Sequence, residues 1–594
     1  MATEEKEKLN DVEKAKINSG YLRGEIGSEL VDGNDHFGKD SVNLLKTHGT
    51  YQQDDRDARA ANRAAGAGRS HIFMVRTRVP GGKMTSAQML AELDICDELG
   101  NATLRITTRQ GLQHHGIPKH SLQETMRRIN ATKLTTLAAC GDVNRNVMCC
   151  PAPHKFDPVH DQLQAFTDEL AEHFKPKTRA YYDIWLRDTE SGEEQCLQGD
   201  DPDVEPIYGR TYLPRKFKMA VGLPGDNCVD LYANDLGFMA ICENFNVVGY
   251  NLLVGGGFGV TPSAKKTFPA VAKRLAYVPA AQAIAAAEAI VKVQRDFGNR
   301  ADRKTARLKY LLHDKGLEWF KAKVEEYAGF TMAEPHPDDV WGFDDHLGWH
   351  EQGDGRWFYG LNVENGRIKD DGAFRLKTAL RLICSTLRPE LRLTSHQSIL
   401  FCDIAPERRD ELQQILRDHG VPLSHEISTV RRWSMACVAW PTCGLSITEA
   451  ERALPGVIDQ LEQELAKIGL AREAFTVRMT GCPNGCARPY NSDVGFVGKA
   501  ANKYTILLGG RLLGDRLNAI YKDSVPEEEL VTSLIPVFHY FKHERAGDET
   551  FGDFCHRKGM ADLAAWAERY TGGANGNGAA VNGATTNGSA NGHA

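Results

Sequence analysis

The sequence predicts an α+β protein in which one folding unit occurs twice along a chain of 594 residues. Three observations support this prediction. Five short segments recur in the same order in both halves, several of them alternate apolar and polar residues as half-buried strands do, and one apolar stripe follows helical spacing. At this length we expect three or four compact units rather than one.

The repeated segments define the two halves. LRITTRQGLQHHGI at 104–117 is echoed by LRLTSHQSILFCDI at 391–404. Four more pairs follow in order: MCCPAP with MACVAWPTC, KFKMAVGLPGDN with FTVRMTGCPNGC, DLGF with DVGF, and YNLLVGGG with YTILLGGR. Each half should therefore hold a small α/β element followed by a larger α/β lobe. We expect the small elements to pair and the lobes to face each other around a pseudo-twofold axis.

The remaining segments are a helix, a linker and two ends. Apolar residues at helical spacing, with Gly469 after them, predict a buried helix: Leu454, Val457, Ile458, Leu461, Leu465 and Ile468. The Pro-, Asp- and Gly-rich stretch 330–356 predicts a linker to the second small element. We expect the first 20 residues to be mobile or to lie across the surface, and the Gly/Asn/Ala-rich stretch 571–594 to be a disordered tail.

Composition narrows the class of protein. A net charge of −7 and a pI near 6.3 argue against a nucleic-acid binder. No apolar run approaches the roughly 18 residues of a membrane span, so no membrane partner is expected. The charged N-terminus lacks the apolar stretch of a secretory signal. Fourteen cysteines without such a signal indicate a reducing cytoplasm and metal binding.

Four cysteines near the C-terminal end form two pairs. Cys437 and Cys443 lie in CVAWPTC, and Cys482 and Cys486 lie in TGCPNGC. Four thiolates can hold zinc or a cubane iron–sulfur cluster. The first pair is spaced more widely than the pairs of most structural zinc sites, and the PNG turn can direct backbone N–H groups at cluster sulfurs. These residues favour a cluster, with a non-catalytic, metal-held scaffold as the alternative from a different class.

The sequence CVAWPTCGLSITEAER followed by TGCPNGCARPYNSDVGFVGKA resembles the signature of the siroheme-dependent sulfite and nitrite reductases. The resemblance extends from about Tyr21 to about Met560. It implies that the four cysteines bind a 4Fe–4S cluster and that Cys486 is also the proximal ligand of the siroheme iron. It also implies a ferredoxin-like domain built from two halves, together with two siroheme-binding lobes.

On this basis the chain divides into six parts. We expect an N-terminal extension at 1–70, the first ferredoxin-like half at 71–138 and a siroheme and substrate lobe at 139–330. The second ferredoxin-like half should occupy 345–425, the iron–sulfur and siroheme lobe 426–570, and the tail 571–594.

A small dianionic substrate requires clustered cations. Lys216 and Lys218 lie at i and i+2, which places both ammonium groups on one face of a strand. Taken alone, such a pair is as readily a solvated strand face, and Arg76 and Arg145 alone are most simply surface charges. The family resemblance changes this interpretation, because all four residues fall where the family has its substrate-binding cations.

The carboxylates of siroheme also require donors. Arg105, Arg109, Gln113 and His115 alternate along what we expect to be one strand, and they match the siroheme-side strand of the family. The resemblance places Asn484 near the macrocycle. The glycine run 255–257 should allow close backbone approach to a cofactor carboxylate. Cys149 and Cys150 fall at the repeat position of the first cysteine pair and are interpreted as relics near the cofactor, whereas Cys228 is interpreted as a core or surface thiol.

The resemblance also bears on substrate and electron donor. Lys218 and the sequence CPNGC favour assimilatory reduction of sulfite to hydrogen sulfide over nitrite reduction. The chain has no flavin or NADPH fingerprint, so its electrons must come from another protein. ACGDVNRNV, YYDIW, LGWHEQGDGRWFYGL and CPNGCARPY favour ferredoxin as the donor, and DLYANDLGF favours the diflavin subunit of an NADPH-linked enzyme.

Overall fold

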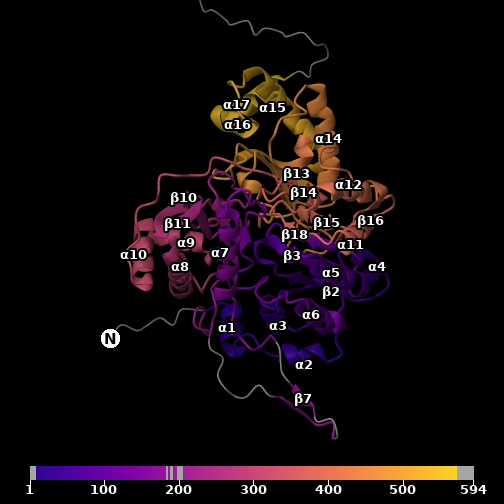
Figure 1. Ribbon diagram of the computed structural model, residues 1–594, viewed down its shortest axis with the longest axis vertical. Coiled ribbons are helices and arrows are strands. Elements are labelled where there is room, and N and C mark those ends of the chain that lie inside the picture. The colour runs from indigo at the N-terminus through magenta and orange to yellow at the C-terminus, as the bar shows by residue number, and fades with distance from the viewer. Residues whose placement is uncertain (1–8, 182–184, 188–190, 197–204, 571–594) are drawn as a thin grey trace, which may run out of the picture.

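The computed structural model describes residues 9–181, 185–187, 191–196 and 205–570, and the predicted tail lies outside this range. In Figure 1 three bodies are visible. The first lobe, with β10 (Leu236–Glu243) and β11 (Asn246–Val254), lies to the left, and the second, with α14 (Leu454–Lys467) and α15 (Leu530–Glu544), lies at the top. The ferredoxin-like elements α5 (Ser86–Glu98) and α11 (Leu376–Thr386) lie to the right.

The two ferredoxin-like halves exchange strands. The first sheet has the order β1 (Thr50–Asp54), β2 (His71–Thr77), β5 (Leu112–Ile117), β4 (Leu104–Ile106) and β15 (Arg367–Ile368), so its last strand comes from the second half. The second sheet has the order β13 (Gly348–Glu351), β14 (Trp357–Leu361), β19 (Ile399–Ile404), β18 (Glu390–Leu393) and β3 (Lys83–Thr85), so its last strand comes from the first half. The expected pairing of the small elements is therefore confirmed.

One hydrophobic core joins these halves. Leu93 of α5 and Leu380 of α11 are fully buried in the same cluster, together with Ile106 and Phe401 from the two sheets. Burying each such side chain contributes about 1.5–3 kcal/mol. The two halves therefore depend on each other for most of their stability.

The two lobes have the same sheet topology. The first has the order β12 (Lys273–Pro279), β11, β10, β9 (Met219–Gly222) and β6 (Met148–Cys149). The second mirrors it with β24 (Ala519–Pro526), β23 (Lys503–Leu508), β22 (Val494–Ala500), β21 (Val477–Thr480) and β20 (Ser434–Ala436). Every repeated sequence segment falls on matching strands, so the duplicated fold is confirmed.

The 104–117 segment is a hairpin, and the prediction of a single strand was wrong. Strands β4 and β5 are antiparallel, with Arg105 opposite Gln113, and the chain turns between them. Gln110 in this turn has φ 54°, and Gln397 in the equivalent turn between β18 and β19 has φ 67°. Left-handed non-glycine residues interrupt strand geometry, and periodicity alone does not reveal them.

Two local predictions can also be compared with the structure. Helix α14 forms as expected, with Leu454, Val457, Ile458, Leu461 and Leu465 buried. The expected linker 330–356 is shorter, because β13 lies inside it and pairs with β14, which begins directly after it. None of the described helices is both long and apolar enough to cross a membrane.

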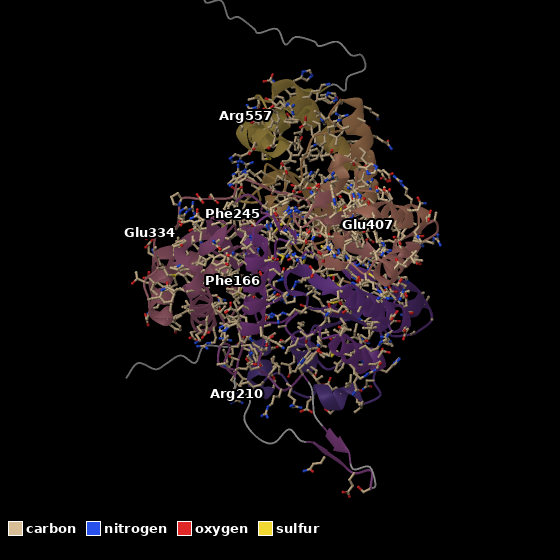
Figure 2. The ribbon with its side chains drawn as sticks, in the orientation of Figure 1. Phe166, Arg210, Phe245, Glu334, Glu407 and Arg557 are labelled. Atoms are coloured by element: carbon tan, nitrogen blue, oxygen red, sulfur yellow. The ribbon has the colours of Figure 1, made fainter. Side chains whose placement is uncertain are left out.

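The described part of the N-terminal extension is packed against the protein. Helix α1 (Asp11–Asn18) buries Lys16, whose Nζ donates to Leu213 O at 2.8 Å. Strand β1 joins the first ferredoxin-like sheet beside β2. Phe166 lies inside the first lobe, whereas Phe245 and Glu334 lie at its outer surface (Figure 2).

Candidate functional site

The four cysteines of the predicted cluster site come together at the end of two strands. Cys437 directly follows β20, and Cys482 follows β21 after Gly481. Strands β20 and β21 are adjacent and parallel, so their carboxyl ends meet. Gly481 N donates to Cys437 Sγ at 3.4 Å, and Asn484 Nδ2 donates to Cys482 Sγ at 3.4 Å. Such N–H groups tune a bound metal centre.

The electrostatics of these thiols show how close they lie. Burial, followed by Cys486 and then Cys482, raises the pKa of Cys437 well above its usual value. Burial and Cys486 raise the pKa of Cys482 to about 11. Among the described side chains, however, no three of the four sulfurs lie within 4.8 Å of one another. A single zinc would need sulfurs roughly 3.8 Å apart, so this spacing fits a larger cluster better.

A row of polar side chains crosses the first ferredoxin-like sheet. Arg76 on β2 is opposite Gln113 on β5, and Gln113 is opposite Arg105 on β4. Paired residues share a face of the sheet, and His115 lies two residues further along the same face. Arg105 forms an ion pair with Glu451 at 2.9 Å and donates to Ala436 O at 2.9 Å. The row therefore faces the lobe that holds the cysteines.

Arg109 lies apart from this row, in the hairpin turn. Its Nη1 donates to Asn234 Oδ1 at 2.8 Å and its Nη2 to Asn146 O at 2.7 Å. Burial, followed by Arg145, lowers the pKa of Arg109 to about 9. The neighbouring Thr108 Oγ1 donates to Cys486 O at 3.1 Å. The turn thus connects the ferredoxin-like domain to the cysteine site.

Lys216 and Lys218 lie on the segment that leads into β9, on either side of buried Phe217. Both line a cavity of about 30 Å³ together with Arg109, Asn484 and Cys486. That volume suits a small oxyanion. Burial, followed by neighbouring cations, lowers the pKa of both lysines well below 10.5. The two ammonium groups are therefore destabilised until an anion joins them.

Arg76 and Arg145 meet through two residues that sequence reasoning missed. Arg76 Nη1 donates to Cys140 Sγ at 2.8 Å, and Arg76 Cζ lies 6.0 Å from the ring centre of Tyr51. Burial alone would lower the pKa of Arg145, but electrostatic interactions with Tyr51 and then Cys140 outweigh burial and raise it. Tyr51 belongs to the N-terminal extension, where nothing in the sequence pattern signalled a site.

The four predicted substrate cations share one property. Within the described part of the chain, no carboxylate forms an ion pair with any of Arg76, Arg145, Lys216 and Lys218. Nearby arginines do have such partners: Arg105 pairs with Glu451, Arg307 with Asp235 and Arg488 with Asp230. Lys216 and Lys218 line the small cavity, whereas Arg76 and Arg145 are not among its lining residues, so the structure brings only the two lysines together at its wall.

His115 lies at a second, larger cavity of about 970 Å³, which also contacts Trp440 of the cysteine loop. Both ring nitrogens of His115 are buried without a hydrogen-bond partner, as is Arg109 Nε. The lining of this cavity mixes carboxylates such as Glu451 and Glu462 with Arg367 and Arg431. Carboxylates outnumber the lysines and arginines in this lining, so the smaller cavity is the better site for an anionic substrate.

Two further features of the site were not expected. Arg307 and Arg488 line the small cavity, although neither stood out in the sequence. A Cβ at Gly256 would lie 2.2 Å from Tyr232 O, and one at Gly257 would lie 2.6 Å from Arg307 Nη2. The glycine run thus packs closely against the protein itself, and its approach to a cofactor carboxylate stays a prediction.

Comparison with known proteins agrees with this geometry. Residues 140–332 and 429–574 match the family described as the nitrite and sulphite reductase 4Fe-4S domain, and residues 67–132 and 350–419 match its ferredoxin-like half domain. The chain belongs to the nitrite and sulphite reductase family. The expectations of an enzyme, of siroheme and of a 4Fe–4S cluster are thereby confirmed.

Relatives of this reductase differ in their electron donor. It is 43% identical over 557 residues to a sulfite reductase [NADPH] hemoprotein β-component of Staphylococcus saprophyticus, covering 94% of this chain and 97% of the relative. It is also 43% identical over 580 residues to a sulfite reductase [ferredoxin] of Synechococcus elongatus, covering 95% and 92%. The solved NirA protein of Mycobacterium tuberculosis is 26% identical, with a TM-score of 0.77 over 94% of this chain and 98% of the other.

The side chains of this reductase fit both cofactors. Four thiols that influence one another electrostatically provide the donor set of a 4Fe–4S cluster. Siroheme carries eight carboxylates, and the unpartnered donors of Arg109 and His115 and the unpaired lysines can meet such groups. Cys486 is exposed at the small cavity, where its sulfur can reach a second metal.

Proposed function

We propose that this reductase converts sulfite to hydrogen sulfide, using six electrons and eight protons and releasing three waters. The observation that supports this most strongly is that Lys216 and Lys218, which have no carboxylate partner among the described residues, line one small cavity with Cys486. Burial, followed by neighbouring cations that include Arg145, lowers the pKa of Lys216. Nitrite carries one negative charge and sulfite two near neutral pH, so a site with this many unpaired cations favours the dianion.

Each predicted residue has a role in this proposal. Cys437, Cys443, Cys482 and Cys486 hold the 4Fe–4S cluster, and Cys486 is also the proximal ligand of the siroheme. Arg105, Arg109, Gln113, His115 and Asn484 contact the siroheme. The siroheme supplies a redox-active iron that binds sulfur and accepts electrons one at a time through the cluster. Arg76, Arg145, Lys216 and Lys218 bind the substrate oxygens.

The cations also promote loss of oxygen. Their low-dielectric surroundings strengthen each contact with a developing negative charge. Lys216 and Lys218 have lowered pKa values, so each gives up a proton more readily than a solvated lysine does. Two protons delivered to a sulfite oxygen allow that oxygen to leave as water.

A spectrum with metal counts tests the reaction. The purified holoenzyme should absorb as a siroheme protein and contain about five irons per chain. With reduced methyl viologen, kcat/KM for sulfite should exceed that for nitrite. A colourless protein whose metal is only zinc would leave a metal-held scaffold instead, and faster nitrite reduction would reassign the substrate.

We further propose ferredoxin as the electron donor. The sequence segments that resemble the ferredoxin-dependent class support this, and the Synechococcus relative carries that name. Leu445 follows Cys443 closely and is 69% exposed, and Arg56 Nη1 donates to the carbonyl oxygens of Cys443 at 3.1 Å and Ser446 at 2.8 Å on either side of it. An acidic ferredoxin fits an apolar contact beside an arginine.

The donor can be tested by supplying each candidate. Reduced plant-type ferredoxin should support sulfide production, whereas NADPH with a diflavin reductase should not. Leu445→Glu should raise the KM for ferredoxin several-fold with the methyl viologen rate unchanged. Ile520→Glu, at a 60% exposed position on β24, is the matched control. Turnover with the diflavin protein alone would favour the NADPH-linked class.

We also propose the domain boundaries and a cytoplasmic location for this reductase. We retain 71–138 and 345–425 as the ferredoxin-like halves and 139–330 and 426–570 as the lobes. The described cysteine side chains are all free thiols, which supports a reducing cytoplasm.

A further inference from the structure

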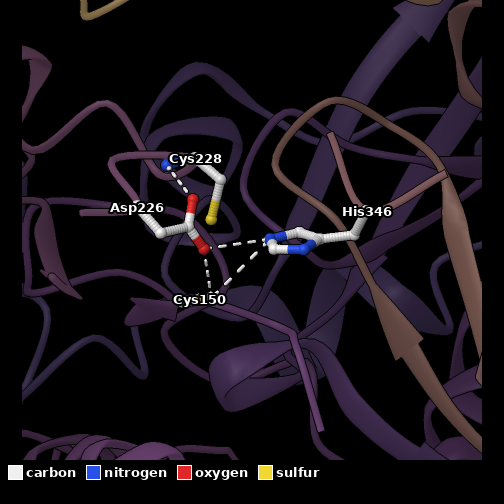
Figure 3. A group of neighbouring side chains, drawn as sticks. All are labelled: Cys150, Asp226, Cys228 and His346. Carbon is white, nitrogen blue, oxygen red and sulfur yellow. Dashed lines mark hydrogen bonds and ion pairs between the residues drawn. The ribbon is translucent and has the colours of Figure 1, made fainter. Parts of the chain in front are cut away.

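A second group of metal-binding side chains lies away from the four cluster cysteines, in the first lobe. Cys150 follows β6, Asp226 and Cys228 lie in the turn after β9, and His346 precedes β13 (Figure 3). One ligand atom from each lies within 4.8 Å of the others. The two cysteines and His346 are each 3% exposed, and Asp226 is 9% exposed.

The distances in this group are those of a small coordination site. Cys150 Sγ lies 2.8 Å from Asp226 Oδ2 and 3.7 Å from His346 Nε2. Asp226 Oδ2 lies 3.0 Å from His346 Nε2. Four ligands around one zinc, with bonds of about 2.0–2.3 Å, lie roughly 3.3–3.8 Å from one another. A small expansion of this group is enough to admit the ion.

Surrounding groups orient the ligands. Asp226 Oδ1 accepts the backbone N–H of Cys228 at 3.2 Å and that of Asp344 at 3.3 Å, which leaves Oδ2 facing Cys150 and His346. His346 Nδ1 lies 3.8 Å from Asp344 Oδ2. At this distance the Asp344 carboxylate does not hydrogen-bond His346, whose Nδ1 is buried without a hydrogen-bond partner in the described part of the chain.

The internal repeat gives independent support. Cys150 lies two residues after Met148, as the cluster ligand Cys437 lies two residues after Met435. Cys228 lies seven residues before Asp235 of DLGF, as Cys486 lies seven residues before Asp493 of DVGF. The first lobe therefore has two thiols at the positions where the second lobe has two of its proposed cluster ligands.

We propose that Cys150, Asp226, Cys228 and His346 bind one zinc ion, separate from the cofactors of the reductase. Two thiolates, an imidazole and a carboxylate are ligands that zinc accepts, in the closed four-coordinate arrangement of structural sites. Because all four side chains are buried, the site has no open position for a substrate. The ion joins β6, the turn after β9 and the segment between the two halves.

The competing interpretation is a network of protonated side chains held only by hydrogen bonds. Elemental analysis of the holoenzyme separates the two. We expect about one zinc per chain in addition to the iron of the cofactors. X-ray absorption spectroscopy at the zinc edge should show two sulfur neighbours at about 2.3 Å and two lighter neighbours at about 2.0 Å. Trace zinc, both as purified and after dialysis against zinc, would overturn the proposal.

Variants test the ligand assignment. Cys228→Ser and His346→Ala should each lower bound zinc at least five-fold, with the siroheme spectrum and iron content retained. Cys384→Ser, at a buried thiol in the ferredoxin-like core, should keep its zinc. If a variant does not fold, the zinc-edge spectrum of the wild-type protein still shows whether zinc has two sulfur and two lighter neighbours. Full zinc content in both folded variants would contradict the assignment.

Discussion

At the scale of single residues, the proposed substrate site contains positively charged side chains that have no carboxylate partner among the described residues. Lys216 and Lys218 face each other with arginines nearby and no carboxylate to offset them among the described residues. Burial, then neighbouring cations, lowers the pKa of both lysines, so their charged forms cost free energy in the folded protein. A bound oxyanion removes this cost. Binding of the substrate therefore relieves the repulsion between the cations of the free protein, and this relief contributes to substrate affinity.

Lys218 should determine preference between substrates. We expect Lys218→Asn to lower kcat/KM for sulfite by about 10²-fold, because one preorganised cation is removed from the site. Nitrite reduction should fall less, since nitrite carries less charge. Methyl viologen assays with both substrates measure the ratio. Lys265→Asn, at an exposed lysine of the same lobe, is the control. An unchanged ratio would remove Lys218 as the specificity residue.

Cys486 should connect the two cofactors. Cys486→Ser is expected to lose the siroheme spectrum and at least 10³-fold in sulfite turnover, because a serine oxygen is a poor substitute for a bridging thiolate. Absorption and sulfide assays measure both effects. The other exposed thiol, Cys242, provides the matched control as Cys242→Ser. Wild-type spectrum and activity in Cys486→Ser would show that the proximal ligand lies elsewhere.

Sequence reasoning was strongest for residues within short motifs. The four cysteines were identifiable because their spacing and the turn between Cys482 and Cys486 carry chemical meaning. Lys216 and Lys218 became site candidates only through the family resemblance, because their i and i+2 spacing alone is equally typical of a solvated strand face. Tyr51 could not be found in this way, because it reaches Arg145 only through the pairing of β1 with β2. Long-range strand pairing leaves no local pattern in the sequence.

At the scale of elements, strand exchange was beyond sequence prediction. Strands β15 and β3 have only two and three residues, too few to show alternation. Their positions are set by glycines with positive φ next to them. Gly366 has φ 75° and Gly82 has φ 76°, and a Cβ at either would lie 2.2 Å from a carbonyl oxygen of the partner half, Ile106 O or Leu393 O. The close approach of the two halves requires residues without a side chain.

Gly366→Ala should therefore destabilise the domain. Its left-handed backbone costs alanine about 1–2 kcal/mol, and the clash with Ile106 O adds to this, for a total of about 3 kcal/mol. Gly372→Ala is the matched control, because Gly372 has φ 59° with nothing within 4 Å of the added Cβ. Thermal unfolding compares them. Equal melting temperatures in the two variants would show that the contact with Ile106 does not matter.

Helix α1 is anchored by Asp142. Its carboxylate lies 2.6 Å from Arg303 and 3.5 Å from Lys16. Asp142→Asn should cost about 3 kcal/mol, because the partly buried Arg303 loses its nearest carboxylate and the buried Lys16 keeps only Glu13 as a counter-charge. Asp523→Asn, from a surface pair with Lys499, should change the free energy of unfolding by less than about 1 kcal/mol.

The pH dependence of this effect follows from the pKa of Asp142. Burial alone would raise it, but Arg303 and then Lys16 outweigh burial and hold it well below its usual 3.8. The stabilisation is therefore fully present above pH 3.8 and is lost as the pH falls through the lowered pKa. Wild type and Asp142→Asn should differ by a constant amount between pH 5 and 8. A difference that disappears in that range would contradict the ion-pair explanation.

At the scale of the whole molecule, the two duplicated lobes have the same sheet topology but carry different functional side chains. The two lobes share sheet order and strand register, yet one presents the four cluster cysteines and the other presents Lys216 and Lys218 to the shared junction. A site between two such lobes can combine soft ligands from one with cations from the other. The order of the repeated segments was enough to predict this arrangement.

The mutual dependence of the halves is testable with a divided chain. We expect residues 1–334 expressed alone to aggregate, because the sheet of β4 lacks β15 and the strand β3 lacks its partner. Co-expression with 335–594 should restore a soluble complex. Size-exclusion chromatography and amide exchange measure this. A monodisperse 1–334 fragment with protected β4 amides would show that the halves are independent.

The late position of the exchanged strand β15 in the sequence delays completion of the first ferredoxin-like sheet during translation. The edge of β4 stays open until Ile368 has left the ribosome, more than two hundred residues after Ile106. At about 5–20 residues per second, that interval is on the order of 10–50 s. The nascent chain therefore exposes a β edge that a chaperone must shield. The cysteine ligands are translated later still, so cofactor insertion follows closure of the ferredoxin-like domain and acts on a scaffold that is already assembled.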